Sequence, residues 1–166
     1  MRKKRAISIV IPVFNEENLL PDLIKQLSCW CDLEDEIIVS DGGSTDGTVS
    51  FCDRVLLIRS KKGRAIQMNE AIKHAKGDVF WFIHADIKIA NISRSELTSD
   101  SNKKPWGFFD VDIEDSHWAF RIIESSMNIR SRLTKIATGD KGIFLTREVF
   151  EEIGGFPAIE IMEDIA

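Results

Sequence analysis

The sequence contains few cysteines, no long apolar run and no surplus of positive charge, and each shortage excludes a class of protein. Its 166 residues include only Cys29, Cys31 and Cys52, without the even count of a disulfide framework or the Cys-x-x-Cys spacing of a zinc site. No apolar stretch approaches the roughly 20 residues that a membrane-spanning helix needs. With 22 Lys and Arg against 27 Asp and Glu, the net charge of −5 argues against a nucleic-acid partner. We therefore expect a globular protein in a reducing, cytoplasmic compartment.

The first half of the chain alternates apolar runs with segments of helical spacing, which predicts a parallel sheet with helices. Four short apolar runs are typical of buried strands: 7–14, 36–40, 55–59 and 79–83. Between them, apolar spacing predicts helices over 19–27 and 63–76, with Asn15 as the cap of the first, and a short helix after Asp46. Strands that alternate with helices indicate an α/β fold, in which ligands bind beyond the carboxyl ends of the strands.

The second half is less regular. Strands are expected over 106–113 and 142–146, and a helix over 147–153. Between 118 and 136, apolar residues at helical spacing are interleaved with four basic residues. Two interpretations of this stripe stay open, a helix that faces the core or one that lies on a membrane surface. No internal repeat and no second domain is evident, so we expect one domain over residues 1–166.

Polar or glycine-rich segments follow all four predicted strands, at the edge where a ligand would bind; they are 15–16, 41–47, 60–64 and 84–86. Asp41 and Asp86 stand at strand ends, where a carboxylate can hydrogen-bond a base or ribose or ligate a hard divalent cation. The alternative is that each acid caps the next helix. The glycines after Asp41 let the backbone approach a ligand closely, and the helix that follows offers N–H groups to an anion.

Three common ligand-binding patterns are absent from the sequence. A calcium loop of EF-hand type is excluded by Gly43 and Cys52, which stand where ligands are needed. Neither the Gly-x-Gly-x-x-Gly fingerprint nor the Walker A pattern occurs. These absences argue against a dinucleotide oxidoreductase and a P-loop NTPase.

Seven sequence blocks, in order along nearly the whole chain, resemble those of family 2 glycosyltransferases, which have the GT-A fold. The blocks are Ser8–Glu17, Asp41–Thr48, Gly63–Asn69, Phe82–Asp86, Thr138–Phe144, Gly154–Pro157 and Met162–Asp164. Each alone is moderately specific, whereas the ordered set is strongly specific. The resemblance implies a mostly parallel α/β sheet with helices on both faces, and an inverting transfer of sugar from a nucleotide diphosphate, expected to be UDP, to a hydroxyl acceptor.

The resemblance also implies roles for single residues. Pro12, Phe14, Glu16 and Asp41 match the positions that hold the nucleoside, and Arg64 matches a basic residue near the diphosphate. His84-Ala85-Asp86 matches the Asp-x-Asp motif that binds Mn²⁺ or Mg²⁺ and the diphosphate, so Asp86 is the expected metal ligand and His84 lies at the nucleotide. Asp164 matches the catalytic base that deprotonates the acceptor hydroxyl.

Two departures from the family pattern limit these implications. His84 stands where the first aspartate of the metal motif is expected; imidazole can ligate Mn²⁺ or bind phosphate but adds no negative charge. The alternative is a strand-end histidine with local hydrogen bonds. Family members continue beyond the position of Asp164, so we expect this domain to be truncated at its C-terminal end. Its nucleotide-binding half is expected at about 1–90 and its acceptor-side half at about 91–166.

Two other functions stay open. One is a domain that binds a nucleotide sugar without transferring it. The other is a nucleotidyltransferase, which would need a glycine-rich basic loop where Pro12–Glu16 stands. The expected partners are a nucleotide-sugar donor and a hydroxyl acceptor, whether a glycan, a lipid-linked molecule or a small molecule. A homodimer is compatible with the sequence, as is peripheral contact with the inner face of a membrane.

Overall fold

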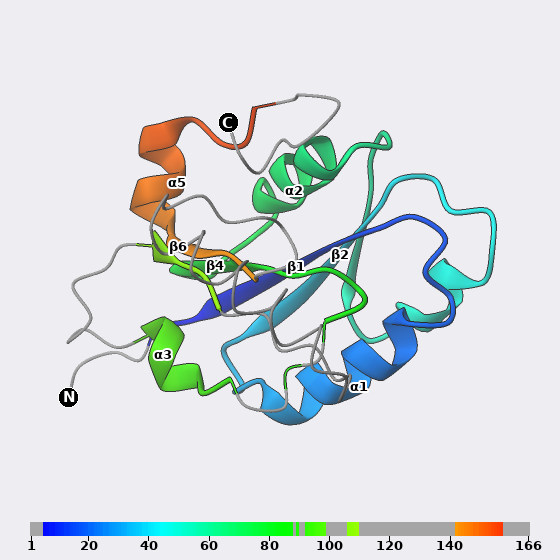
Figure 1. Cartoon of the computed structure of the whole chain (residues 1–166), viewed down its shortest axis with the longest axis horizontal. Helices are drawn as coiled ribbons and strands as arrows, with labels where there is room; N and C mark the ends of the chain where they lie inside the picture. The colour runs from blue at the N-terminus through cyan, green and yellow to red at the C-terminus, as the bar shows by residue number, and fades with distance from the viewer. Residues whose placement is uncertain (1–4, 88, 90–91, 99–105, 110–141, 158–166) are drawn as a thin grey trace, which may run out of the picture.

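In the described part of the chain, a mixed six-stranded sheet lies between helices (Figure 1). The computed structural model describes residues 5–87, 89, 92–98, 106–109 and 142–157. The strands are β1 (Ile7–Val13), β2 (Glu36–Asp41), β3 (Leu56–Arg59), β4 (Val79–Phe82), β5 (Trp106–Gly107) and β6 (Phe144–Thr146). The helices are α1 (Leu20–Trp30), the 3-10 helix η1 (Thr48–Phe51), α2 (Arg64–Ile72), α3 (Arg94–Thr98) and α5 (Arg147–Ile153). None of the described helices is long and apolar enough to cross a membrane.

The strand order is β3-β2-β1-β4-β6-β5. Strands β1 to β4 are parallel, whereas β6 is antiparallel to both β4 and β5. The chain builds outward from β1 through β2 to β3 and then returns to place β4 on the other side of β1. In open α/β sheets, ligands bind at such a reversal, beyond the carboxyl ends of the strands.

Each face of the sheet has its own apolar core, because alternate residues of a strand point to opposite faces. Ile9 and Ile11 of β1 pack on one face in a cluster that includes Leu23 of α1. Val10 of β1 packs on the other face in a cluster that includes Met68 of α2. Figure 1 shows α1 and α3 on one side of the sheet and α2 and α5 on the other. Burial on both faces explains why β1 is almost entirely apolar.

The predicted α/β architecture is confirmed, and the differences lie at the ends of elements. Helix α2 ends at Ile72, four residues before its predicted end, and β5 covers only the first two residues of the strand expected over 106–113. The helical stripe at 118–136 lies outside the described residues. The prediction that Asn15 caps α1 is wrong, because the cap position is Leu19 and has no side-chain hydrogen bond. Asn15 has a φ of 56°, and its Oδ1 accepts a hydrogen bond from the Thr45 N–H.

A buried ion pair is hydrogen-bonded to the amino end of β1. The Arg94 guanidinium donates to both carboxylate oxygens of Asp35, at 2.9 and 2.7 Å, and the Ile7 N–H donates to the same carboxylate at 3.0 Å. The Asp35 side chain is fully buried, with 0% of its surface exposed. Burial acts to raise the pKa of Asp35, but the hydrogen bonds from Arg94 and the backbone outweigh it and hold the pKa below its usual range.

Candidate functional site

The predicted nucleotide-site residues in the described part of the chain lie at one edge of the sheet, where β1, β2 and β4 end. The register pairs Pro12 with Ser40, and Val13 with Asp41, so the carboxyl ends of β1 and β2 are level. The Ile83 N–H donates to the Val10 carbonyl, which keeps the end of β4 beside β1. The residues at this edge are Pro12, Phe14, Glu16, Asp41, Arg64, His84 and Asp86.

Asp41 is a buried carboxylate with one unpartnered oxygen. Only 1% of the residue is exposed, and its Oδ1 accepts from the Ser44 N–H at 3.0 Å. Its Oδ2 has no hydrogen-bond partner among the described residues. Asp41 is not the cap of the next helix, because η1 has Gly47 at that position and no side-chain cap. Since a buried acceptor without a donor is unfavourable, this oxygen suits a ligand that brings a hydrogen-bond donor.

Hydrogen bonds tie the loop after β1 to the loop after β2. The Asn15 N–H donates to Ser44 Oγ at 2.9 Å, and the Glu16 N–H donates to Thr48 Oγ1 at 2.8 Å. The Gly47 N–H donates to a carboxylate oxygen of Glu17 at 2.8 Å. These contacts hold the backbone around Asp41 and Glu16 in one arrangement before any ligand arrives. The Asn15 side chain also joins the two loops, because its Oδ1 accepts from the Thr45 N–H, and this explains why it does not cap α1.

Glu16 lies at a negatively charged part of this edge. Its pKa is raised, mainly because partial burial disfavours the charged form, and further because Asp86 and Asp46 repel it. The positive charge of Arg64 opposes the rise. Glu16, in the loop after β1, therefore interacts electrostatically with Asp86 after β4 and with Arg64 at the start of α2.

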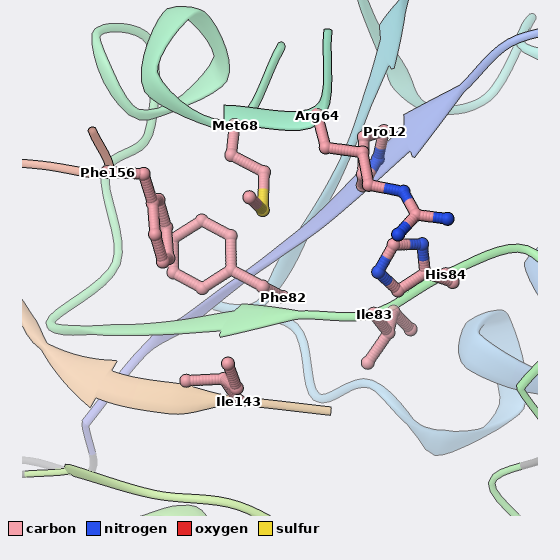
Figure 2. A pocket seen from close by; sticks show the side chains of 8 residues that line it. All are labelled: Pro12, Arg64, Met68, Phe82, Ile83, His84, Ile143 and Phe156. Carbon is pink, nitrogen blue, oxygen red and sulfur yellow. The ribbon is translucent and has the colours of Figure 1, made fainter. Parts of the chain in front are cut away.

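A small pocket with apolar walls opens beside Arg64 and His84. Figure 2 shows the Arg64 side chain extending from α2 toward the His84 ring, which follows β4. The remaining walls are Pro12, Met68, Phe82, Ile83, Ile143 and Phe156. The ring centroids of Phe82 and Phe156 are 4.9 Å apart, and the rings meet edge to face. Two basic side chains at the mouth of a pocket can bind an anionic group such as phosphate.

Phe14 lies on the same edge in contact with a cation that the sequence did not single out. The Lys62 Nζ lies 3.6 Å from the centre of the Phe14 ring, within the range of a cation–π contact. Lys62 belongs to the loop between β3 and α2, which also leads to Arg64. This loop therefore brings two basic side chains to the nucleotide-site residues.

Among the described residues, Asp86 is the predicted ligand of a divalent cation. In the part of the chain that the structure describes, no three His, Cys, Asp or Glu side chains are grouped closely enough to bind a metal. The Asp86 side chain is exposed at a turn and offers carboxylate oxygens, the type of ligand that Mg²⁺ and Mn²⁺ prefer. With Asp86 as its ligand from the described residues, such a cation would need further oxygens, and a diphosphate could supply them.

Gln67 is a contributor that sequence reasoning missed. It is 3% exposed, and its Nε2 donates to the carbonyls of Val13 and Ser40 at 2.8 and 2.7 Å. The signal was present in the sequence, because Gln67 is the polar member of an otherwise apolar face of α2. Its neighbours on that face are Ala65, Met68, Ala71 and Ile72. Asp164, the predicted catalytic base, lies outside the described residues.

Comparison with known proteins points to one family. The sequence model of the family described as Glycosyl transferase family 2 matches residues 8–92, about half of the chain. A curated protein of Bacillus subtilis (strain 168), "Uncharacterized glycosyltransferase YfnE", is 35% identical over 92 residues. That alignment covers 50% of this chain and 24% of the relative.

Solved structures share the fold at low sequence identity. S. aureus TarS 1-349 has a TM-score of 0.71 at 18% identity, with 96% of this chain and 52% of that chain covered. A mannosyltransferase from Pyrobaculum calidifontis, in complex with GDP-Man and Mn²⁺, has a TM-score of 0.68 at 19% identity, with 98% and 50% covered. A glucosyl-3-phosphoglycerate synthase from Mycobacterium tuberculosis, with Mn²⁺, UDP-Glc and phosphoglyceric acid, has a TM-score of 0.61 at 20% identity, with 88% and 58% covered. The predicted GT-A fold is confirmed, and the chain spans 50 to 58% of these structures and 24% of the curated relative.

Proposed function

Since this chain belongs to glycosyl transferase family 2, we propose that it binds a nucleotide-diphosphate sugar and transfers the sugar to a hydroxyl acceptor. The observation that carries the proposal is the buried Asp41 carboxylate, whose free oxygen can accept a hydrogen bond from a nucleoside. The basic side chains of Arg64 and His84 lie at the same edge of the sheet and suit the diphosphate. A hydrogen-bond acceptor for the nucleoside and basic side chains for the diphosphate match the two ends of one nucleotide-sugar molecule.

The rest of the nucleotide site follows from the same edge. Pro12 near the end of β1, with Phe14 and Glu16 in the loop after it, lies at the same edge of the sheet as Asp41, and these residues would contact the nucleoside. We propose UDP as the nucleotide, with GDP as the alternative, because the similar solved structures include complexes of both types. The first half of the chain, about 1–90, then forms the donor side, and residues from about 91 onward belong to the acceptor side.

A divalent cation, Mn²⁺ or Mg²⁺, is part of the proposal. Asp86 would hold it together with oxygens of the diphosphate, and two similar solved structures contain Mn²⁺ with a nucleotide sugar. When bound, the cation would stabilise the negative charge that develops on the departing diphosphate. Arg64 and His84 would bind oxygens of the diphosphate as well, and so would help to neutralise that charge.

The transfer step itself rests on the family resemblance. The acceptor hydroxyl loses its proton to Asp164, and its oxygen forms a bond to the anomeric carbon while the bond to the diphosphate oxygen breaks. Attack from the face opposite the leaving group inverts the configuration at that carbon. The acceptor that carries this hydroxyl is a glycan, a lipid-linked molecule or a small molecule. The proposed compartment is reducing and cytoplasmic, because three cysteines without a Cys-x-x-Cys pair are not typical of a disulfide framework.

Calorimetric titration of UDP, with and without Mn²⁺, tests the donor site in the wild type and in Asp86→Ala. Removing an exposed carboxylate leaves the fold intact, so the variant should lose the Mn²⁺-dependent part of UDP binding and keep the metal-free part. Asp53→Ala removes an exposed acid outside the site and serves as the matched control. An unchanged effect of Mn²⁺ in Asp86→Ala would remove Asp86 from the metal site. Absence of UDP and GDP binding in the wild type under all conditions would refute the proposed function, and binding without sugar transfer would favour a binding domain.

A further inference from the structure

Gln67 lies beneath the candidate donor site, on the face of α2 that packs against the sheet. The residue is almost fully buried, with 3% of its surface exposed, and its neighbours Met68 and Ala71 belong to the apolar core. A buried amide is unfavourable unless its donors and its acceptor are satisfied. The partners of Gln67 therefore show what the side chain does at this position.

The Gln67 amide connects three separate segments of the donor site. Its Nε2 donates to the Val13 carbonyl at 2.8 Å and to the Ser40 carbonyl at 2.7 Å. Its Oε1 accepts from the Gly63 N–H at 3.3 Å. Two acceptors face the nitrogen and one donor faces the oxygen, so only this orientation of the amide satisfies the network.

Each of these three partners is directly bonded to a residue of the donor site. Val13 precedes Phe14 and Ser40 precedes Asp41, both at the nucleoside end, whereas Gly63 precedes Arg64 at the diphosphate end. Gly63 itself has a φ of 139°, which L side chains rarely adopt, so the chain enters α2 in a conformation that depends on glycine. A single side chain thus joins the backbone of both ends of the site.

The backbone at Gly42 packs directly against the Gln67 amide. A Cβ at Gly42 would lie 3.1 to 3.2 Å from the amide carbon, oxygen and nitrogen of Gln67, closer than ordinary contact allows. The glycine after Asp41 therefore lets the β2 end settle directly against the amide. This close approach explains why the position after Asp41 carries no side chain.

We propose that Gln67 is a positioning residue that fixes the spacing between the nucleoside end and the diphosphate end of the donor site. This inference rests on the proposed function, because it assigns both ends to one nucleoside diphosphate. A ligand that spans two subsites gains affinity from the second only when the spacing fits. Uridine, which occupies only the nucleoside end, is insensitive to that spacing.

The test compares UDP and uridine binding in the wild type, Gln67→Met and Gln67→Glu. Methionine keeps the size of the side chain and removes all three hydrogen bonds, whereas glutamate keeps an acceptor for Gly63 but directs oxygen at two carbonyl oxygens. We expect UDP affinity to fall about tenfold in Gln67→Met, which corresponds to about 1.4 kcal/mol, and further in Gln67→Glu. Uridine affinity should stay within about threefold of the wild type. Calorimetry measures UDP binding, and ligand-observed NMR measures the weaker uridine binding, both well below the thermal midpoint of each variant.

Ser8→Ala is the matched structural control, at the opposite end of β1. Ser8 is also fully buried, and its Oγ donates to Glu36 at 2.6 Å and accepts from the Gly77 N–H at 2.8 Å. This variant should lower the thermal midpoint without changing the ratio of UDP to uridine affinity. Equal losses of UDP and uridine affinity in the Gln67 variants, or no loss of either, would overturn the positioning role. If the wild type binds neither UDP nor uridine, the proposed function fails and the role of Gln67 fails with it.

Discussion

Replacing Asp41 with asparagine separates a functional carboxylate from a structural one. The change keeps an oxygen that can accept from the Ser44 N–H, the hydrogen bond that Asp41 makes at 3.0 Å. It replaces a carboxylate by an amide in a residue that is only 1% exposed. The second carboxylate oxygen, Oδ2, has no partner among the described residues, so its replacement breaks no described hydrogen bond. The folded state therefore loses little, and we expect the free energy of unfolding to stay within about 1 kcal/mol of the wild type.

Ligand binding should respond much more strongly than stability. A hydrogen bond from the nucleoside to a charged acceptor contributes about 1.5 to 3 kcal/mol, so UDP affinity should fall by about one to two orders of magnitude. The loss should appear without Mn²⁺ as well as with it, because the nucleoside end does not depend on the metal. Urea denaturation measures the stability, calorimetric titration of UDP measures the affinity, and Asp53→Asn is the control for removing one exposed negative charge. A variant that unfolds several kcal/mol more easily while binding UDP normally would show that Asp41 has a structural role only.

Three further predictions concern charges elsewhere in the chain. Because the pKa of Glu16 is raised, mainly by burial and then by Asp86, the charged form opposes folding and stability falls as pH rises through that pKa. The free energy of unfolding of Glu16→Gln, measured by urea denaturation, should therefore exceed that of the wild type by more at about pH 7 than at about pH 4. An equal difference at both pH values would contradict this. Arg94→Met leaves the buried Asp35 carboxylate without its cation and should reduce the free energy of unfolding by about 3 kcal/mol at neutral pH. Since the pKa of Asp35 is lowered, this difference should shrink as pH falls and Asp35 is protonated in the wild type; a constant difference would argue against the ion pair. Asp164→Asn should leave UDP binding unchanged and abolish sugar transfer, and surviving transfer would place the base elsewhere.

The predicted strands were accurate where burial on both faces left a continuous apolar signal. The expected strand over 7–14 corresponds to β1 at Ile7–Val13, and the expected strand over 79–83 corresponds to β4 at Val79–Phe82. The expected helix over 63–76 was too long: residues after Ile72 have helical composition, but the chain forms a turn there and α2 ends. Such ends depend on packing against β1 and β2 rather than on local propensity.

Asn15 shows how a tertiary contact can override a local preference. Asparagine before a helix is a favourable cap, which is why the sequence favoured that role. In the structure its side chain instead accepts from the Thr45 N–H, some 30 residues away along the chain. No local pattern contains this partner, because the two loops meet only after β1 and β2 pair.

The strand–helix alternation, and the edge at which polar segments collect, could be predicted from apolar periodicity and from the rule for parallel connections. The sequence also identified Asp41 and Asp86 as candidate site residues from their places after strands. Three features required the folded structure: β6 lies between β4 and β5, one buried Asp41 oxygen has no partner among the described residues, and Gln67 joins the ends of β1 and β2 to the start of α2. Burial and hydrogen bonding between distant segments depend on how the sheet is assembled, and residue spacing along the chain does not specify them.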